Sequence, residues 1–250
     1  MHIGLLGGTG PAGRALAARM ASLGYPVTIG SRSRYRAMEI RDTIVSRWPD
    51  HHLEVEASDN EGAASAEVVV IATPWDGAAE TALSVKEALA GKVVISMANA
   101  LARVGGEFQP LVPPRGSVAA SVQAAVPEAL VAAAMHHLPA KELGAIDQPI
   151  DSDVLICSDH LRATEVTTDI VRAIPGLRAL DAGHLSNATP IEAFTAVLLQ
   201  LNVRYKTRVA VKLTGIDERD APTGQAGASA VASSNGEAPT DADAPVLDEV

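Results

Sequence analysis

The fold of this chain is decided by its first stretch, MHIGLLGGTGPAGRALAARM, which covers residues 1–20. The apolar run over residues 2–6 predicts a short buried strand. Residues 11–23 predict a helix, since they are rich in Ala and Leu and proline is well placed in a first helical turn. Between strand and helix lies a G-x-G-x-x-G motif, formed by Gly8, Thr9, Gly10, Pro11, Ala12 and Gly13.

The three glycines of this motif have separate expected tasks. We expect Gly8 to permit a tight turn, Gly10 to let the backbone approach an anion, and Gly13 to allow close packing of helix on strand. A helix N-terminus also favours an anion through its free N–H groups and its dipole. In this strand–turn–helix setting the motif predicts a site for the pyrophosphate of a dinucleotide, rather than a purely structural turn.

Short strands and helices alternate along the first hundred residues. The strands are rich in Val, Ile and Leu, as expected for a parallel sheet that is covered on both faces. A repeated βα pattern predicts an α/β fold with a Rossmann-type, doubly wound parallel sheet. The expected strands are residues 2–6, 27–30, 53–57, 68–72 and 93–97, and the expected helices are residues 11–23, 34–48, 60–66 and 76–90.

The second half of the chain predicts a further, smaller C-terminal domain. Helices are expected over residues 117–125, 161–174 and 191–206, and strands over residues 130–135, 154–158 and 177–181. We expect residues 1–135 to form the dinucleotide-binding domain and residues 136–216 the small domain. Residues 217–250 are rich in Ala, Gly, Ser, Pro and Asp, which predicts a disordered acidic tail. An acidic interaction tail is the alternative.

The formal net charge of −10 is concentrated in this tail. Eight acidic residues and one basic residue, Arg219, lie beyond Ile216, so the rest of the chain is close to neutral. The sequence has no excess of basic residues that would indicate a nucleic-acid partner. No apolar run approaches the roughly 20 residues that a membrane span needs. Cys157 is the single cysteine, and the N-terminus does not resemble a signal peptide, so we expect a cytoplasmic protein.

The end of the second expected strand indicates which dinucleotide binds. An NAD site places Asp or Glu here, about 20 residues beyond the glycines, to bind the ribose hydroxyls. The chain instead has Ser31, Arg32 and Arg36, with Ser33 and Arg34 between them and no carboxylate. Arginine and serine side chains bind a 2′-phosphate through hydrogen bonds that are strengthened by charge. The sequence therefore predicts NADP rather than NAD.

The usual sets of catalytic residues are missing from the sequence. There is no Tyr-x-x-x-Lys, HExxH or GxSxG motif and no plausible Cys–His nucleophile pair, and the pair His136-His137 lacks further ligands at a spacing that suits a metal. We therefore expect no catalytic acid or base and no metal. Hydride transfer between two flat heteroaromatic rings fits this absence, because it needs orientation and exclusion of water rather than proton transfer by the protein.

Five motifs, in order, resemble those of the coenzyme F420-dependent NADP oxidoreductases over residues 1–216. They are GGTGxxG at residues 7–13, GSR at 30–32, TPW at 73–75, HHLPA at 136–140 and LDAGHLSN at 180–187. The resemblance implies that hydride passes between NADP(H) and the deazaflavin coenzyme F420, which enters a cleft between the two domains. The loop at residues 97–100 and His137 depart from the family pattern.

The resemblance also implies roles for particular side chains. Thr9, Gly10, Pro11 and Ala12 hold the pyrophosphate, and Ser31, Arg32 and Arg36 hold the 2′-phosphate. Thr73, Pro74 and Trp75 line the nicotinamide side. The residues expected to face the deazaflavin are His136, Leu138, Pro139, Leu185, Ser186 and Asn187.

Two other functions also fit the residues. One is an NADP-sensing regulatory protein without turnover, and the other is a related NADPH reductase that acts on a ferric or imine acceptor. Four cations between Arg204 and Lys212 either bind the anionic tail of F420 or interact with the C-terminus of the last helix. That helix carries an apolar face, from Ile191 to Tyr205, which can pack on its own core or on a second copy in a homo-oligomer.

Overall fold

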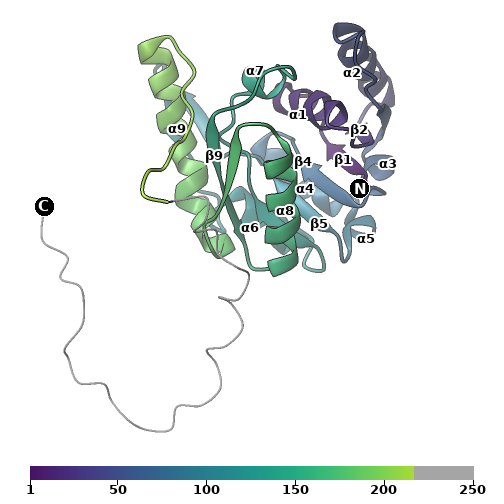
Figure 1. Cartoon of the computed structure of the whole chain (residues 1–250). Helices are drawn as coiled ribbons and strands as arrows, with labels where there is room; N and C mark the ends of the chain where they lie inside the picture. The colour runs from purple at the N-terminus through teal and green to yellow at the C-terminus, as the bar shows by residue number, and fades with distance from the viewer. Residues whose placement is uncertain (217–250) are drawn as a thin grey trace, which may run out of the picture.

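The structure is a computed structural model that describes residues 1–216; the predicted acidic tail, residues 217–250, lies outside the described residues. An eight-stranded sheet forms the centre of the molecule (Figure 1), in the order β3-β2-β1-β4-β5-β8-β9-β10. Its strands are β1 (Ile3–Leu6), β2 (Val27–Ser31), β3 (Val55–Asp59), β4 (Val68–Ile71), β5 (Val93–Ser96), β8 (Leu130–Ala133), β9 (Ser152–Ser158) and β10 (Leu177–Asp181).

The six strands from β3 to β8 are parallel, and β1 pairs with β2 on one side and with β4 on the other. This is the doubly wound arrangement predicted from the βα alternation, so the fold class is confirmed. β9 pairs antiparallel with β8, with Ala133 opposite Cys157, and β10 runs parallel to β9. β9 and β10 thus extend the same sheet, and the division into two domains at residue 135 stays a prediction.

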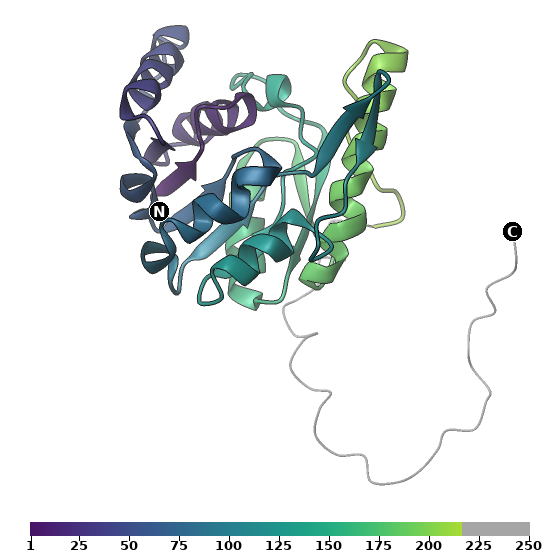
Figure 2. The same ribbon diagram turned by 180° about the vertical axis from the view of Figure 1, so that it is seen from behind.

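Helices cover both faces of the sheet (Figures 1 and 2). The core on one face includes residues of α1 (Pro11–Ser22), α2 (Arg34–Arg47), α7 (Ala140–Leu143) and α8 (Leu161–Ala173). The core on the other face includes residues of α3 (Asn60–Ala64), α4 (Trp75–Leu83), α5 (Lys86–Leu89) and α6 (Val118–Ala125). The chain then continues through a short 3-10 helix, η1 (Leu185–Asn187), into α9 (Ala188–Tyr205).

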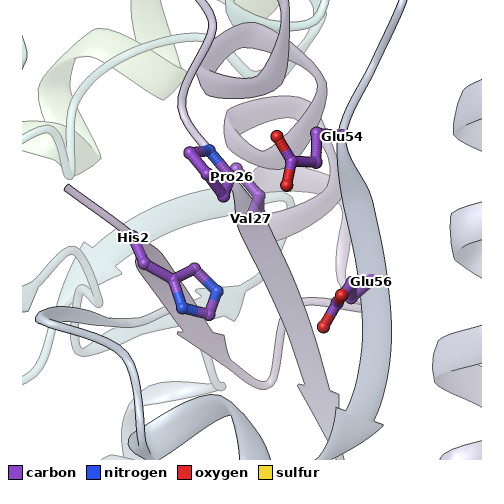
Figure 3. A pocket seen from close by; sticks show the side chains of 5 residues that line it. All are labelled: His2, Pro26, Val27, Glu54 and Glu56. Carbon is purple, nitrogen blue, oxygen red and sulfur yellow. The ribbon is translucent and has the colours of Figure 1, made fainter.

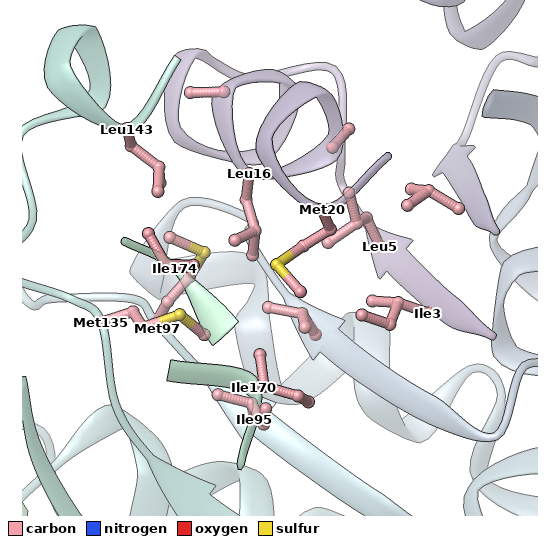
Figure 4. Packing of buried hydrophobic residues seen from close by; sticks show 14 of the residues in the cluster. Ile3, Leu5, Leu16, Met20, Ile95, Met97, Met135, Leu143, Ile170 and Ile174 are labelled. Carbon is pink, nitrogen blue, oxygen red and sulfur yellow. The ribbon is translucent and has the colours of Figure 1, made fainter. Parts of the chain in front are cut away.

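The first of these cores joins the N-terminal helix to segments that are distant in the chain. Figure 4 shows Leu16 and Met20 of α1 among Met97, Met135 and Ile174, and all five side chains are buried. Aromatic residues make up 3% of the chain, so aliphatic side chains and methionine fill this space. The packing holds the glycine turn, which precedes α1, in a fixed relation to the segments that follow β5 and β8.

Two elements differ from the sequence-based expectation. The helix expected over residues 76–90 is divided into α4 and α5, because Ser84 and the β-branched, buried Val85 lie between them and both favour a helix less than their neighbours. An unexpected hairpin of β6 (Leu101–Val104) and β7 (Glu107–Pro110) lies beside α9 in Figure 2. Its turn uses Gly105 and Gly106, both with positive φ.

A buried carboxylate joins α9 to α6. Glu192 accepts hydrogen bonds from the backbone N–H groups of Val118 (2.8 Å) and Ala119 (3.1 Å) at the α6 N-terminus. Burial raises the pKa of Glu192 to about 7, although these two donors oppose the shift. Within residues 1–216, no helix combines the length and the apolar character that crossing a membrane would require.

Candidate functional site

The segments that follow β1, β4, β5 and β8 meet at one edge of the sheet, since these strands are parallel. The order of the strands reverses between β1 and β4, which lie side by side although β2 and β3 come between them in the chain. Ligands of open α/β sheets bind outside the carboxyl ends of the strands at such a switch point. The carboxyl edge is therefore the candidate site.

The glycine turn lies at this edge, and the structural roles of its glycines differ in part from those predicted. Gly7, rather than Gly8, has the positive φ (69°) of a tight turn, and a Cβ there would lie 2.4 Å from the Thr73 side chain. A Cβ on Gly8 would lie 3.0 Å from side-chain atoms of Leu5 and Ile29, so Gly8 serves close packing instead. The sequence predicted the tight turn at Gly8 because Gly8 is the first glycine of the G-x-G-x-x-G motif.

Gly10 and Gly13 have surroundings that match their expected tasks. A Cβ on Gly13 would lie 2.7 Å from the backbone of Gly8, so this glycine lets α1 pack closely on the turn. A Cβ on Gly10 would meet no described atom closer than 3.8 Å, so this part of the backbone is open. Gly10 precedes Pro11, the first residue of α1, and no acidic side chain lies in the first turn. Thr9 and Ala12 are half-buried and Pro11 is exposed. An anion fits here electrostatically.

The residues expected to hold a 2′-phosphate lie together at the end of β2. Ser31 is buried and its hydroxyl accepts a hydrogen bond from the backbone N–H of Ser33 (3.2 Å). Arg32 is exposed and takes part in no ion pair within residues 1–216. Arg36, one helical turn on, pairs with Glu39 at 2.6 Å, and both side chains are more than half exposed. Arg32 is therefore the better placed of the two arginines to meet a phosphate.

Thr73, Pro74 and Trp75 follow β4 and form the start of α4. Thr73 lies against Gly7 of the glycine turn, and its hydroxyl oxygen is buried without a hydrogen-bond partner within the described residues. A buried hydroxyl without a partner costs free energy, so it marks a place where a ligand can complete the hydrogen bonding. Pro74 is exposed, while Trp75 is half-buried and packs on the core, which gives it a structural role as well.

His136 and its neighbours follow β8 on the same edge. The His136 side chain is 6% exposed, and neither ring nitrogen has a hydrogen-bond partner within residues 1–216. Burial, helped by the nearby His137, lowers the pKa of His136 to about 3, so the ring is neutral at physiological pH. The nearby backbone of Ala134 acts in the other direction and raises the pKa of the ring, although it does not meet the criteria for a hydrogen bond to either nitrogen. Leu138 is buried and Pro139 is half-buried.

The ring of His137, by contrast, has a hydrogen-bond partner within the protein. Its Nε2 donates to the backbone carbonyl of Asp153 at 2.7 Å, and burial lowers the pKa of the ring. The two rings meet edge to face, with centroids 5.4 Å apart. His136 is thus the histidine of this pair with hydrogen-bonding capacity left for a ligand.

Leu185, Ser186 and Asn187 form the short helix η1, which follows β10. β10 leads into this segment and runs antiparallel to β8. Its last residue, Asp181, pairs with Ile156, next to the Cys157–Ala133 pair, so β10 ends level with the carboxyl end of β8. Leu185 is buried in the core, Ser186 is exposed, and the Asn187 side chain donates to the Ala182 carbonyl at 2.7 Å. This geometry gives the segment a structural role, and its contact with the deazaflavin stays an untested prediction.

Two of the four cations at and after the end of α9 already form ion pairs within residues 1–216. Arg208 pairs with Glu142 at 2.8 Å and Lys212 with Asp151 at 2.6 Å. The helix ends at Tyr205, and Lys206 takes up a left-handed conformation beyond it. Arg208 and Lys212 therefore also fasten the last described segment to the body of the protein, a role that the cluster of charges did not reveal.

A surface pocket of about 250 Å³ lies away from this site (Figure 3). It is lined by His2, Pro26, Val27, Glu54 and Glu56, at the amino ends of β1, β2 and β3. His2 already bonds the Thr28 hydroxyl at 2.8 Å. Ligands of this fold bind at the carboxyl edge, and we assign no ligand to this pocket.

Comparison with known proteins now identifies the family. A family model described as "NADP oxidoreductase coenzyme F420-dependent" matches residues 2–100. The F420-dependent NADP reductase of Methanocaldococcus jannaschii is 33% identical over 223 residues, which cover 87% of this chain and 100% of that relative. The chain belongs to the coenzyme F420-dependent NADP oxidoreductase family.

Two further members extend this comparison. The F420-dependent NADP reductase of Methanothermobacter marburgensis is 35% identical over 224 residues, covering 87% of this chain and all of the relative. A crystal structure from Arthrobacter sp. FB24, provisionally named an F420 dependent NADP-reductase, superposes with a TM-score of 0.72 and 27% identity. It covers 86% of this chain and 99% of that chain. The resemblance predicted from the five motifs is confirmed.

Proposed function

We propose that this chain transfers hydride between NADP(H) and the deazaflavin coenzyme F420. The relatives bear the name F420-dependent NADP reductase, and they match this chain over their whole length. One observation in the structure carries the proposal. The open backbone at Gly10, the buried and unpartnered hydroxyl oxygen of Thr73 and the buried, unpartnered ring of His136 follow β1, β4 and β8, whose carboxyl ends lie at one edge of the sheet.

The NADP part of the proposal assigns each phosphate to a surface that suits it. The backbone at Gly10 and the start of α1 hold the pyrophosphate, and Ser31 and Arg32 hold the 2′-phosphate. Thr73 supplies its unused hydroxyl beside the turn. Arg36 contributes less, since it shares its charge with Glu39. The segment from His136 to Pro139 faces F420.

When both substrates are bound, their rings supply the hydride donor and acceptor, and the protein orients them. The neutral ring of His136 can donate or accept one hydrogen bond without adding a charge. Side chains that are buried around it exclude water from that part of the site. No acid or base from the chain is required for this step.

The direct test is an absorbance assay in which the protein is mixed with NADPH and oxidised F420. We expect the absorbance of the oxidised deazaflavin to fall, and to fall far more slowly with NADH at the same concentration. An NADP-sensing protein would bind NADPH without this change. A reductase of ferric or imine acceptors would oxidise NADPH only when such an acceptor is added. Either result would overturn the proposal.

Replacing Arg32 with Ala tests the 2′-phosphate site. We expect NADPH binding to weaken by roughly 1.5–3 kcal/mol, the usual contribution of a hydrogen bond to a charged group, and NADH binding to stay the same. Arg36→Ala should have a smaller effect because of the pairing with Glu39. Titration of each variant with both nucleotides measures this. An equal loss for NADPH and NADH after Arg32→Ala would show that Arg32 is structural.

We also propose a cytoplasmic, homo-oligomeric protein. The single cysteine, Cys157, is buried, as in many proteins of a reducing compartment. The apolar face expected on α9 is divided in the structure: Leu198 is buried, but Phe194 and Tyr205 remain 44% and 72% exposed, with Val197 beside them at 49%. Sedimentation of the purified chain tests the association.

A further inference from the structure

A single side chain joins three segments at the edge of the candidate site. Asn99 lies in the loop after β5, where the sequence departs from the family pattern. Its Nδ2 donates to the backbone carbonyl of His136 at 2.7 Å. Its Oδ1 accepts a hydrogen bond from the hydroxyl of Thr195, in the middle of α9, at 3.2 Å. Asn99 thus connects the loop after β5, the loop after β8 and the last helix.

The segment that Asn99 holds is one that needs support. Met135, the residue before His136, has a φ of 60°, a left-handed conformation that is rare for side chains other than Gly, Asn and Asp. Such a conformation is unfavourable for a side chain of this kind and persists where surrounding contacts impose it. Met135 is fully buried, so its packing fixes one side of the strained residue, and the Asn99 hydrogen bond fixes the other.

The strained conformation of Met135 determines where the next side chain lies. The turn at Met135 directs the His136 ring into a buried position where neither nitrogen has a partner in the described residues. A protein that needed His136 for packing alone would gain by pairing it or replacing it with an apolar side chain. The strained turn and the unpartnered ring together indicate a side chain kept ready for a ligand.

We propose that Asn99, oriented by Thr195, is a positioning residue that sets the place of the His136 ring against F420. The inference rests on the proposed function and assigns it a further part. Asn99 acts through the backbone carbonyl of His136 and not by contact with the rings. The carbonyl of His136 can only accept, so Nδ2 must face it; Thr195 donates to the Oδ1 on the other side and so holds the amide in this orientation.

Steady-state kinetics of the full chain test the proposal. We expect Asn99→Leu to lower kcat/KM for F420 by on the order of 100-fold, the usual effect of misplacing a reacting group by about 1 Å. The affinity for NADPH should change less than about twofold, since the glycine turn is untouched. Thr195→Val should lower kcat/KM for F420 roughly tenfold, the value of one hydrogen bond, and Thr195→Ser, which keeps the hydroxyl, should restore it.

A matched control separates positioning from loss of a buried hydroxyl. Thr167 in α8 is buried like Thr195, but its hydroxyl has no partner within the described residues. Thr167→Val should therefore leave both kinetic constants unchanged. If Asn99→Leu lowers NADPH affinity and F420 turnover to the same extent, or if Thr195→Ser fails to restore what Thr195→Val loses, the positioning role is wrong.

A second measurement does not depend on turnover. The ¹⁵N signals of the His136 ring, assigned by their loss in His136→Phe, report its environment. We expect them to shift or broaden in Asn99→Leu and Thr195→Val, and to remain as in the wild type in Thr167→Val. If the wild type does not reduce F420, the proposed function fails, and these signals alone decide whether Asn99 positions His136. Unchanged signals in Asn99→Leu would overturn the positioning role.

Discussion

A Gly10→Val variant should fold as the wild type does and lose NADPH binding by at least about 100-fold, or roughly 2.7 kcal/mol. The backbone of Gly10 is extended, with φ −73° and ψ 168°, a conformation that a β-branched residue readily adopts. A Cβ would have no described neighbour closer than 3.8 Å. The new Cβ therefore meets only ordinary contacts, and the side chain projects where a pyrophosphate would approach the turn. Titration with NADPH, beside thermal unfolding, measures both parts.

Gly13→Val is the informative partner of this variant. It places the same side chain three residues further on, but its Cβ would lie 2.7 Å from the Gly8 backbone, which cannot move aside as a flexible side chain can. We expect this variant to lose stability, with a lower melting temperature. If Gly10→Val unfolds in the same way, or binds NADPH like the wild type, the glycine turn is not the pyrophosphate site.

The first hundred residues were predictable because their signals are local. The buried strands are short apolar runs, and the turn residues follow them directly, so β1, β2, β4 and β5 were placed to within a residue or so of their bounds. The NADP residues follow the same logic, since Gly10 and Ser31 are defined by their distance from a strand end. Even here Gly7 was missed, because its role depends on contact with Thr73, which is 66 positions away in the chain.

The remaining features depend on contacts that no local pattern records. The antiparallel pairing of Ala133 with Cys157 continues the sheet through β9. Nothing in the sequence of either strand indicates that the two strands pair. The hairpin of β6 and β7 did leave a signal, the pair Gly105-Gly106 between two short runs, of which the second, Glu107–Pro110, alternates in polarity. Asn99 left none, because its partners, His136 and Thr195, lie in other elements.

The largest effect on stability is expected at Arg19, another residue that no motif marks. It lies in α1 and is 1% exposed. Its guanidinium donates to five backbone carbonyls of one segment, at distances of 2.8 to 3.1 Å: those of Glu142, Leu143, Ala145, Ile146 and Gln148. Nε and Nη1 each donate to one carbonyl, and the two N–H groups of Nη2 are shared among the other three, so all three nitrogens are directed at this segment. Arg19 therefore ties α7 and the residues after it to the helix that begins at the glycine turn.

Arg19→Met keeps much of the side-chain volume and removes all of these donors. We expect a loss of about 3 kcal/mol in the free energy of unfolding, because two of the hydrogen bonds are fully buried and their carbonyls would lack a partner. For a chain of this size this corresponds to a melting temperature lower by roughly 6–12 °C. Arg19→Lys should lose less, since an ammonium retains three donors. Arg14→Met, on the exposed side of the same helix, is the control and should change stability by less than about 0.5 kcal/mol.

Hydrogen exchange shows where this loss is felt. If Arg19 holds α7 in place, replacing it with Met should raise the exchange rates of the amides of residues 140–148, relative to the wild type, more than those of the sheet. This segment loses its main attachment while the hydrogen bonds of the sheet stay intact. The segment directly follows His136–Pro139, so F420 turnover should fall at temperatures where the variant is still folded. A uniform rise in exchange across the chain, or a melting temperature equal to that of Arg14→Met, would contradict a clamp between α1 and α7.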